Sequence, residues 1–345
     1  MHMLAKLKNW IKDAKIIYKE IILAKGHFKV PFFTRLKMNL RGFTADQYVR
    51  YDLKNNDISD YISEFERWKS RRINGRYNVI MDDKLLFPEV FGRYVDVPKN
   101  LAWIDKGTVY NLIGGQFTVP NLCSLLAKYK QVVVKPVYAQ GSGRGVHLIC
   151  WTEDGILVNG QKHTWDSLMA SLTKLTNYVI VEYVWQHPYS AKLFPKSTNT
   201  IRLVSVLDDG QASLINAVHR IGVEASIPVD NGTKGALVAE IDMETGTLGR
   251  AKTFYKITSF TKHPETGAPI QNIQIPHWAQ VKEKVLAVAQ NFPYIPFMAW
   301  DIVITRDGFM VIEVNTSSGV NLFQMWRGER RGPLGEFYRR HGIIK

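Results

Sequence analysis

A glycine-rich loop set between two β-rich segments is the feature that most constrains the fold of this chain. The stretch VVVKPVYAQGSGRGVHLI, residues 132–149, places glycines at alternate positions, with a lysine six residues before the first of them. Apolar, β-branched residues flank the loop on both sides, and such runs favour strands. The segment therefore predicts a hairpin that consists of a strand carrying Lys135, a glycine loop and a second strand.

Three kinds of phosphate-binding loop are rich in glycine, and the flanking residues distinguish between them. A Walker A loop ends in Gly-Lys-Ser/Thr and leads into a helix, and the Rossmann fingerprint also places the phosphate at a helix N-terminus. Here the lysine precedes the glycines, and the following VHLICW alternates like a strand. Two alternatives remain: a hairpin loop whose backbone N–H groups meet phosphate oxygens, and a hairpin whose glycines only turn the chain.

A second hairpin is predicted at residues 298–319, MAWDIVITRDGFMVIEVNTSSG, where two apolar runs flank an Asp-Gly pair. Side chains alternate between the two faces of a strand, so the loop length decides which of them meet. A two-residue loop would place Asp301 and Glu313 on opposite faces. A three-residue loop, closed by Gly308 in the left-handed conformation, sets Asp301 across from Glu313 and leaves Asn315 on the same face.

The three polar residues of this hairpin suggest a metal site. Two carboxylates that face each other repel unless a cation lies between them. The oxygens of Asp301, Glu313 and Asn315 are hard ligands of the kind that Mg²⁺ takes, usually together with substrate phosphates. We therefore expect a Mg²⁺ site, with Mn²⁺ as the alternative ion, in the register that pairs Thr305 with Phe309. An amphipathic strand with its polar side chains in water is the other interpretation.

Taken together, these features resemble the ATP-grasp superfamily over about residues 95–325: a lysine-bearing strand before a glycine loop, an acidic residue near VEYV in a later strand, and a closing Asp…Glu-x-Asn hairpin. Four segments are similar to the sugar-transfer-associated ATP-grasp group, which occurs with polysaccharide biosynthesis genes and is related to alpha-L-glutamate ligases. They are STNTIRLVSV, VDNGTKGALVAEID, KHPETGAPI and FMAWDIVITRDGFMVIEVNTSSGVNLFQ. The resemblance implies an α+β ATP-grasp fold, in which two α+β subdomains clamp ATP.

The resemblance also implies roles for individual residues. Lys135 would contact the nucleotide phosphates, beneath a lid formed by Gly141, Ser142, Gly143 and Gly145. The hinge strand that faces adenine would comprise Glu182, Tyr183 and Val184. The catalytic group near the γ-phosphate and the reacting carboxylate would comprise Asn199, Arg202 and Arg220, although Arg220 could instead be a surface arginine of its strand. Mg²⁺ would bind Asp301, Glu313 and Asn315.

One position departs from the pattern. DNGTKGA has Lys234 where a second glycine is expected, so this lysine would reach an anionic substrate or point to solvent. The histidines are scattered along the chain, and none is identified as a general base.

The chemistry that the resemblance implies is the joining of a carboxylate to an amine. A carboxylate attacks the γ-phosphate of ATP, and an amine then captures the acyl phosphate to give an amide, while Mg²⁺ and arginine neutralise the developing charge. The expected function is such a ligase in cell-surface polysaccharide assembly (capsule or O-antigen), for example joining an amino acid or amine to a uronic-acid sugar. A kinase of the same fold and a non-catalytic, membrane-associated nucleotide-binding scaffold are the alternatives.

The basic charge of the chain lies mainly at its two ends. The net charge is +14, and residues 1–42 hold ten Lys/Arg against two acidic residues. A basic excess confined to terminal segments argues against a nucleic-acid partner. Within residues 1–25, apolar residues at helical spacing border a row of lysines, which predicts a helix that lies on an anionic membrane surface or packs on the protein itself. A cytoplasmic, peripheral position follows, since no run of 18 apolar residues occurs.

The remaining pattern divides the chain into three parts. Residues 1–94 form a helical basic region, residues 95–184 the first ATP-grasp part with the glycine loop, and residues 185–345 the second part with the metal hairpin. Helices are expected at about residues 44–69, from about Pro120, and at about residues 276–290.

Overall fold

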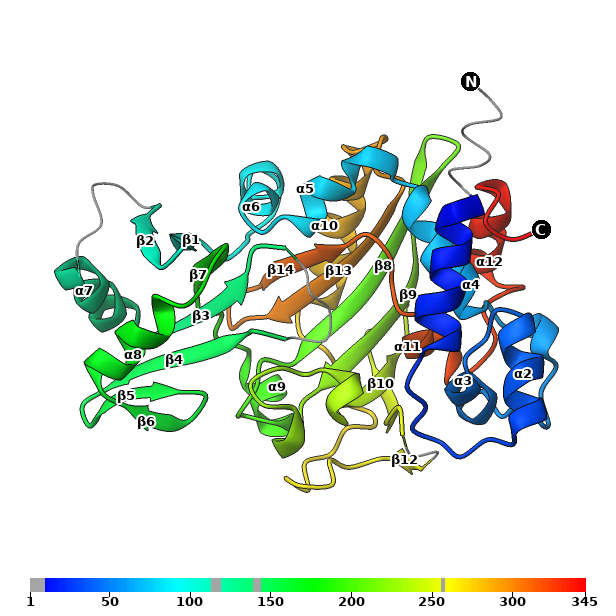
Figure 1. Cartoon of the computed structure of the whole chain (residues 1–345), viewed down its shortest axis with the longest axis horizontal. Coiled ribbons are helices and arrows are strands. Elements are labelled where there is room, and N and C mark those ends of the chain that lie inside the picture. Colours follow the sequence, from blue (N-terminus) through cyan, green and yellow to red (C-terminus); the bar gives the residue numbers. More distant parts are fainter. Residues whose placement is uncertain (1–9, 113–118, 139–143, 256–257) are drawn as a thin grey trace.

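The computed structural model describes residues 10–112, 119–138, 144–255 and 258–345. Two antiparallel sheets, each with helices on its faces, form an α+β fold, which the sequence predicted. Sheet 1 lies at one end of the molecule and the helices of residues 10–69 at the other, with sheet 2 between them (Figure 1). Each sheet has seven strands within the described part of the chain.

Sheet 1 has the strand order β2-β1-β7-β3-β4-β5-β6, and every neighbouring pair is antiparallel. Its strands are β1 (Asn100–Asp105), β2 (Thr108–Asn111), β3 (Gln131–Pro136), β4 (His147–Thr152), β5 (Gly155–Val158), β6 (Gln161–His163) and β7 (Tyr178–Glu182). The helices α7 (Val119–Tyr129) and α8 (Trp165–Leu172) belong to the same part of the chain. Leu122, Leu126 and Leu168 from these helices pack with strand residues in one apolar core. As predicted, the glycine loop joins two paired antiparallel strands, β3 and β4.

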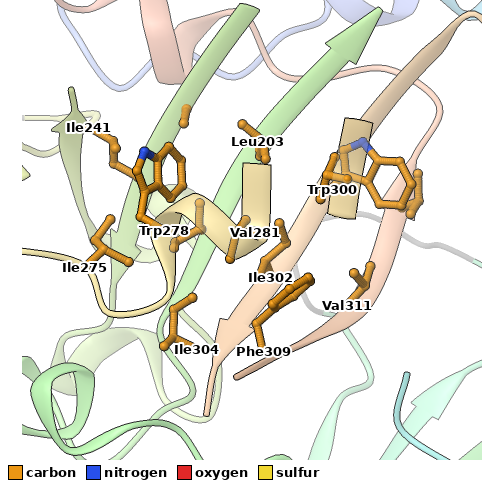
Figure 2. Packing of buried hydrophobic residues seen from close by; sticks show 14 of the residues in the cluster. Leu203, Ile241, Ile275, Trp278, Val281, Trp300, Ile302, Ile304, Phe309 and Val311 are labelled. Atoms are coloured by element: carbon orange, nitrogen blue, oxygen red, sulfur yellow. The ribbon is translucent and has the colours of Figure 1, made fainter. Parts of the chain in front are cut away.

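Sheet 2 has the order β12-β11-β10-β9-β8-β13-β14 and is also antiparallel throughout. Its strands are β8 (Thr200–Asp208), β9 (Gln211–Ile221), β10 (Leu237–Ile241), β11 (Leu248–Lys252), β12 (Ser259–Phe260), β13 (Phe297–Ile304) and β14 (Phe309–Asn315). The helix α10 (Trp278–Gln290) covers one face, where Trp278 and Val281 belong to the same apolar core as Leu203, Trp300 and Ile302 (Figure 2). Every residue of β13 is buried, so the hairpin of β13 and β14 is anchored in this core.

Helices and loops from both ends of the chain cover the other face of sheet 2. The C-terminal helices α11 (Asn321–Gln324) and α12 (Pro333–Arg340) bring Leu322 and Phe337 onto it. Ile62, from the N-terminal region, is fully buried in the same cluster. The N-terminal region is therefore packed onto the second sheet.

The helical region predicted over residues 44–69 consists of two short helices in the structure. They are α3 (Ala45–Arg50) and α4 (Glu64–Lys69), and the 3₁₀ turn η2 (Ile58–Asp60) lies between them. Each begins with a capping box, Thr44 with Gln47 and Ser63 with Glu66. The second capping box, Ser-x-x-Glu, is a start signal that the helical periodicity concealed.

Further short helices complete the N-terminal region: α2 (Phe32–Leu40), η3 (Ser70–Arg72), η4 (Gly75–Tyr77), α5 (Asn78–Asp82) and α6 (Leu86–Phe91). Elsewhere the structure has α9 (Pro188–Leu193), η5 (Glu224–Ser226) and η6 (Gly232–Lys234).

The basic N-terminal helix is present, but few of its apolar side chains are covered. Residues 10–16 are α-helical and continue into the π-helix η1 (Ile17–Ile22) beside α4 (Figure 1). Ile21 is fully buried, whereas Tyr18 remains 58% exposed. The following helix, α2, leaves Phe33 and Leu40 81% exposed. Among the described residues, no helix is long and apolar enough to cross a membrane.

Candidate nucleotide and metal site

A cleft of about 480 Å³ lies between the two sheets and is closed on a third side by the N-terminal region. Sheet 1 contributes Val133, Lys135 and Leu148, and sheet 2 contributes Arg202, Asp301 and Glu313. Glu64, Arg67 and Lys84 come from the N-terminal region. The volume falls within the range of small-molecule sites, and charged groups from three parts of the chain converge on it.

Two lysines approach each other on one side of this cleft. Lys135 projects from β3 as predicted, and Lys84, between α5 and α6, contacts Glu313 with 3.6 Å between Nζ and Oε1. Burial, together with the nearby ammonium of Lys84, lowers the pKa of Lys135 to about 8. Burial and like-charge repulsion both disfavour the second ammonium, so an anion bound between the two lysines would relieve this cost.

Of the predicted lid, only the last residue can be placed. Gly141, Ser142 and Gly143 lie outside the described residues. Gly145 has a φ of +73°, and a Cβ added there would lie 2.5 Å from Tyr178 Oη. Glycine is therefore required at the end of the loop, for both its conformation and its lack of a side chain.

The three predicted hinge residues, Glu182, Tyr183 and Val184, all line the cleft. Glu182 ends β7, and its carboxylate accepts a hydrogen bond from the backbone N–H of Lys99 at 2.8 Å. Val184 is buried at 7% exposure, and burial raises the pKa of the Tyr183 hydroxyl. Tyr183 and Val184 thus give this part of the cleft an aromatic and an aliphatic lining.

The hairpin of β13 and β14 sets Asp301 across from Glu313, as the sequence predicted, but through a different loop. The expected pairing of Thr305 with Phe309 is wrong, because Ile304 pairs with Phe309. The loop between β13 and β14 therefore comprises residues 305–308, one residue more than the expected 306–308. A β-bulge between Asp301 and the next pair restores the register of the carboxylates.

Gly308 also differs from the expectation. Its φ is not among the positive values, so it does not adopt the left-handed conformation. The backbone N–H of Thr305 instead donates to the carbonyl oxygen of Gly308 at 2.9 Å and closes the loop.

Two arginines neutralise Asp301, Arg202 with a buried side chain and Arg220 with a partly buried one. Arg202 donates to both carboxylate oxygens, at 2.6 and 3.0 Å, and Arg220 lies 3.1 Å from Oδ2. Burial alone would favour the neutral acid, but the two guanidinium groups outweigh it and hold the pKa of Asp301 below its ordinary value. The alternative of a surface position for Arg220 is wrong, since its side chain is only 15% exposed.

Arg220 is shared between two carboxylates. It lies 3.5 Å from Asp230 as well as close to Asp301, and its Nε donates to Thr200 Oγ1 at 2.9 Å. Burial opposes its charge, yet Asp230 and Asp301 raise its pKa above the ordinary value. The cleft therefore contains a fixed charge network rather than isolated ions.

The other two predicted metal ligands are closer to the open cleft. Asn315 donates from Nδ2 to Asp301 Oδ2 at 3.3 Å, which leaves its carbonyl oxygen available as a ligand. Glu313 has a side chain that is 28% exposed, with Lys84 as its ion-pair partner. Asp, Glu and Asn oxygens from two adjacent strands are a donor set that suits Mg²⁺. Among the described residues, no cluster of three His, Cys, Asp or Glu side chains occurs, so the amide is needed to complete the set.

Two residues singled out in the sequence do not face the cleft. Asn199 is 2% exposed, and its Nδ2 donates to the carbonyl oxygens of Ser190 and Phe194, at 2.8 and 3.0 Å. Its Oδ1 accepts from the N–H of Gly222 at 2.9 Å. The side chain is therefore committed to holding the backbone, which argues against the predicted catalytic position. Lys234 lies in η6 but does not line the cleft.

Two cationic residues of the N-terminal region lie at the cleft without having been predicted from the sequence. Arg67 of α4 lines the cleft and donates to the carbonyl oxygen of Ser318 at 3.4 Å, while Arg202 donates to the hydroxyl of the same serine at 3.3 Å. Lys84 was missed too. Both were assigned to a region outside the resemblance, and only the tertiary packing brings them to the cleft.

The family assignment rests on a direct match. A family model described as sugar-transfer associated ATP-grasp matches residues 64–332. The chain belongs to this family. The predicted resemblance and the predicted ATP-grasp fold are thereby confirmed, but the matched range begins earlier than residue 95 and includes Arg67 and Lys84. ATP-grasp ligases use ATP with Mg²⁺ to join carboxylates to amines.

Several solved structures are similar to this chain at low identity. D-alanyl-alanine synthetase A from Vibrio cholerae O1 is 14% identical, covers 76% of this chain and 65% of its own, and has a TM-score of 0.42. The ADP complex of the N5-carboxyaminoimidazole ribonucleotide synthetase purK is 9% identical, with 72% and 51% covered and a TM-score of 0.42. The ATP-grasp ligase PsnB with a minimal precursor is 16% identical, with 77% and 62% covered and a TM-score of 0.38.

This chain thus spans about half to two thirds of the length of these structures. No curated protein matches it significantly.

Proposed function

We propose that this protein is an ATP- and Mg²⁺-dependent carboxylate-amine ligase that forms an amide through an acyl phosphate. Its place is cell-surface polysaccharide biosynthesis (capsule or O-antigen), for example the joining of an amino acid or amine to a uronic-acid sugar. The single observation that carries the proposal is the cleft, in which two lysines face a hairpin that bears Asp301, Glu313 and Asn315, with Asp301 held by two arginines. Family membership agrees with it.

In this proposal the nucleotide lies along the sheet 1 side of the cleft. The adenine ring contacts the wall at Tyr183 and Val184, and the phosphates meet Lys135 and Lys84. The lid predicted at Gly141, Ser142, Gly143 and Gly145 remains part of this proposal. Bound phosphate would stabilise the ammonium of Lys135, because opposite charge raises a lysine pKa that burial has lowered.

Glu313, Asn315 and Asp301 would hold the Mg²⁺, and Mn²⁺ would fit the same oxygens. The ion supplies neutralisation of the ATP phosphates and fixes their position. Asp301 already shares its oxygens with Arg202 and Arg220, so it would be the ligand whose position is most tightly determined.

The arginines would act on the transferring phosphoryl group. Arg202 is buried and Arg220 partly buried; Asp301 holds both in place, and both line the cleft from adjacent strands. Donors fixed in this way stabilise developing charge without reorganising, which is the main contribution that a protein makes to phosphoryl transfer. Asn199 would act from outside the cleft by fixing the backbone at Ser190, before β8, and at Gly222, after β9.

Two rival functions use the same cleft. A kinase would transfer the phosphoryl group to a hydroxyl, and a scaffold would bind ATP without turnover. ADP release that requires both a carboxylate and an amine supports the ligase. A phosphorylated product without an amide identifies the kinase, and ATP binding without ADP release identifies the scaffold.

We further propose a cytoplasmic protein that lies on the inner face of the membrane. The N-terminal helix predicted within residues 1–25 and the neighbouring α2 together support this position. α2 leaves Phe32, Phe33 and Leu40 exposed at 72%, 81% and 81%. Residues 10–41 hold eight Lys/Arg against two acids, so the surface combines large apolar side chains with positive charge, as interfacial helices do. The division of the chain into three parts, residues 1–94, 95–184 and 185–345, is also a proposal.

A further inference from the structure

A second, smaller cavity adjoins the cleft beside the N-terminal helices. This side pocket has a volume of about 220 Å³ and shares four lining residues with the cleft: Glu64, Thr233, Phe254 and Asn321. Most of its other lining comes from η1, α2, α3 and the segments that join them. Because part of the wall belongs to both spaces, a group held in the side pocket lies next to the cleft.

The side pocket also reaches the protein surface. Lys25, Gly26, His27 and Arg35 line it, and all four are exposed residues. His27 keeps half of its side chain exposed, although its ring contacts Asp46 at 2.9 Å. None of the four exposed residues lines the cleft. The side pocket therefore has an opening to solvent between η1 and α2, separate from the cleft.

The helix beside this opening carries an apolar surface. At about 100° per residue, one arc of about 100° on α2 consists of exposed apolar side chains. They are Phe32, Phe33, Leu36 and Leu40. Arg35 lies about 60° beyond the Phe32 edge of this apolar arc, on the side of the buried Met38. The residue that lines the opening thus stands at the border of the apolar arc.

The end of η1 extends the apolar surface around the opening. Ile22 and Leu23 are both exposed. Arg35 Nη2 donates to the carbonyl oxygen of Ile22 at 3.3 Å, so α2 and η1 are joined at a residue of the side pocket. Exposed apolar side chains from both elements therefore border the opening, at the end of the molecule away from sheet 1 (Figure 1).

The wall shared with the cleft presents a hydrogen-bond donor. Asn321 Oδ1 accepts from Gln47 Nε2 at 3.2 Å and from the hydroxyl of Tyr51. The amide is thereby oriented, and its Nδ2 donates to no other group among the contacts of the described residues. Acidic and basic side chains also line the side pocket. A hydrocarbon chain would deprive these polar groups of water, whereas a polar head with a carboxylate would accept from Asn321.

We propose that the carboxylate substrate of the ligase is lipid-linked, and that its polar head enters the side pocket while its lipid stays in the membrane. An interfacial helix buries its apolar face about 5–10 Å into the boundary between head groups and acyl chains. A helix is about 10–12 Å wide, so residues at the border of that face lie at the level of the head groups.

Arg35 and the opening that it lines would lie at this depth. The side pocket would then lead from the membrane surface to the cleft. The inference rests on the proposed ligase function and on the proposed membrane position. It names one substrate by class: a lipid whose head group bears the reacting carboxylate.

The first experiment measures where the opening lies in the membrane-bound protein. A bimane label on Lys25→Cys, in the full chain with Cys123→Ala and Cys150→Ala, marks the side pocket. The matched control is the same label on Lys284→Cys, an exposed residue of α10 that lines neither cavity. On phosphatidylglycerol vesicles whose head groups carry a nitroxide, the label at residue 25 should lose about half of its fluorescence and the label at residue 284 none. Equal quenching at the two positions, or none at either, would overturn the proposal.

The second experiment tests the preference for a lipid-linked head. Dodecyl β-D-glucuronide and methyl β-D-glucuronide share one head group, and each would be titrated into the labelled Lys25→Cys protein on phosphatidylglycerol vesicles. The dodecyl form should change the fluorescence at a total concentration about tenfold lower, because the membrane raises its effective concentration. Adding Ala24→Trp, which fills the side pocket, should abolish this response but leave vesicle binding unchanged. Equal responses to the two glucuronides, no response to either, or an equal response to dodecyl β-D-glucoside would overturn the proposal.

ADP release separates a failure of this inference from a failure of the ligase. The same proteins would receive ATP, Mg²⁺ and soluble amino acids and uronic-acid sugars. ADP release with these soluble substrates, but no quenching at residue 25, would reject the lipid-linked substrate alone. Quenching and a glucuronide response without ADP release would reject the ligase and leave head-group binding in the side pocket established.

Discussion

Replacing Asp301 and replacing Glu313 should have very different effects on folding, although both are proposed ligands of one ion. Asp301→Asn keeps the shape of the side chain but removes the charge that Arg202 and Arg220 share. Both guanidinium groups are then left buried with less compensation. Breaking a buried ion pair from one side costs about 3–5 kcal/mol.

Glu313→Gln removes a weaker contact. Its side chain is 28% exposed, and its partner Lys84 lies 3.6 Å away. Partly exposed pairs of this kind contribute about 0–1 kcal/mol. A kcal/mol shifts the midpoint of thermal unfolding by about 2–4 °C for a unit of roughly 150–250 residues. We therefore expect Asp301→Asn to lower the midpoint by about 6–20 °C, and Glu313→Gln by at most about 4 °C.

Thermal unfolding without nucleotide, followed by circular dichroism, measures this difference. Arg202→Gln serves as the partner control, because the double variant with Asp301→Asn should cost less than the sum of the two single changes. Equal midpoints for Asp301→Asn and Glu313→Gln would refute the argument that Asp301 is the centre of a buried charge network. Both variants should lose ATP-dependent activity, so Glu313→Gln separates the metal site from the fold.

Three further predictions concern the lysine, the lid and the membrane face. ATP affinity should fall as the pH rises from about 7 to about 9, because the ammonium of Lys135 is present below its pKa of about 8 and lost above it. In Lys135→Met, the ATP affinity measured by titration should be low and independent of pH over this range. Gly145→Ala should lower stability by about 1–3 kcal/mol in thermal unfolding, and adding Tyr178→Phe should recover part of it, since the Tyr178 hydroxyl lies where the new Cβ would be. Co-sedimentation with vesicles that contain phosphatidylglycerol should be weakened by Phe33→Ser and by added salt. Leu86→Ser should not weaken it, because Leu86 is also exposed but lies outside the basic face. Equal binding by both variants would contradict the membrane proposal.

The sequence predicted local pairings well where alternation along a strand decides them. Reading the glycine loop as a hairpin was correct because its flanks alternate like strands. The facing of Asp301 and Glu313 was also correct, although the bulge in β14 compensated for a loop of the wrong length. Such compensation leaves no mark in the sequence, because a bulge depends on how two strands pack in the sheet.

The contacts that the sequence could not supply are those between distant segments. Lys84 and Arg67 reach the cleft only because the N-terminal helices pack on sheet 2, and nothing in their own neighbourhoods distinguishes them from surface cations. Asn199 illustrates the opposite error. It stands near Arg202 in the chain, yet its amide is turned away to bind the backbone of α9 and its neighbours.

The most direct test of the ligase proposal is oxygen transfer from the carboxylate substrate. The full chain would be incubated with ATP, Mg²⁺ and a panel of amino acids and uronic-acid sugars, with the carboxylate of each active substrate labelled with ¹⁸O. An acyl phosphate intermediate predicts ADP release that requires both carboxylate and amine, an amide product, and one labelled oxygen in the released phosphate. A phosphorylated product without amide, or phosphate without label, would contradict it.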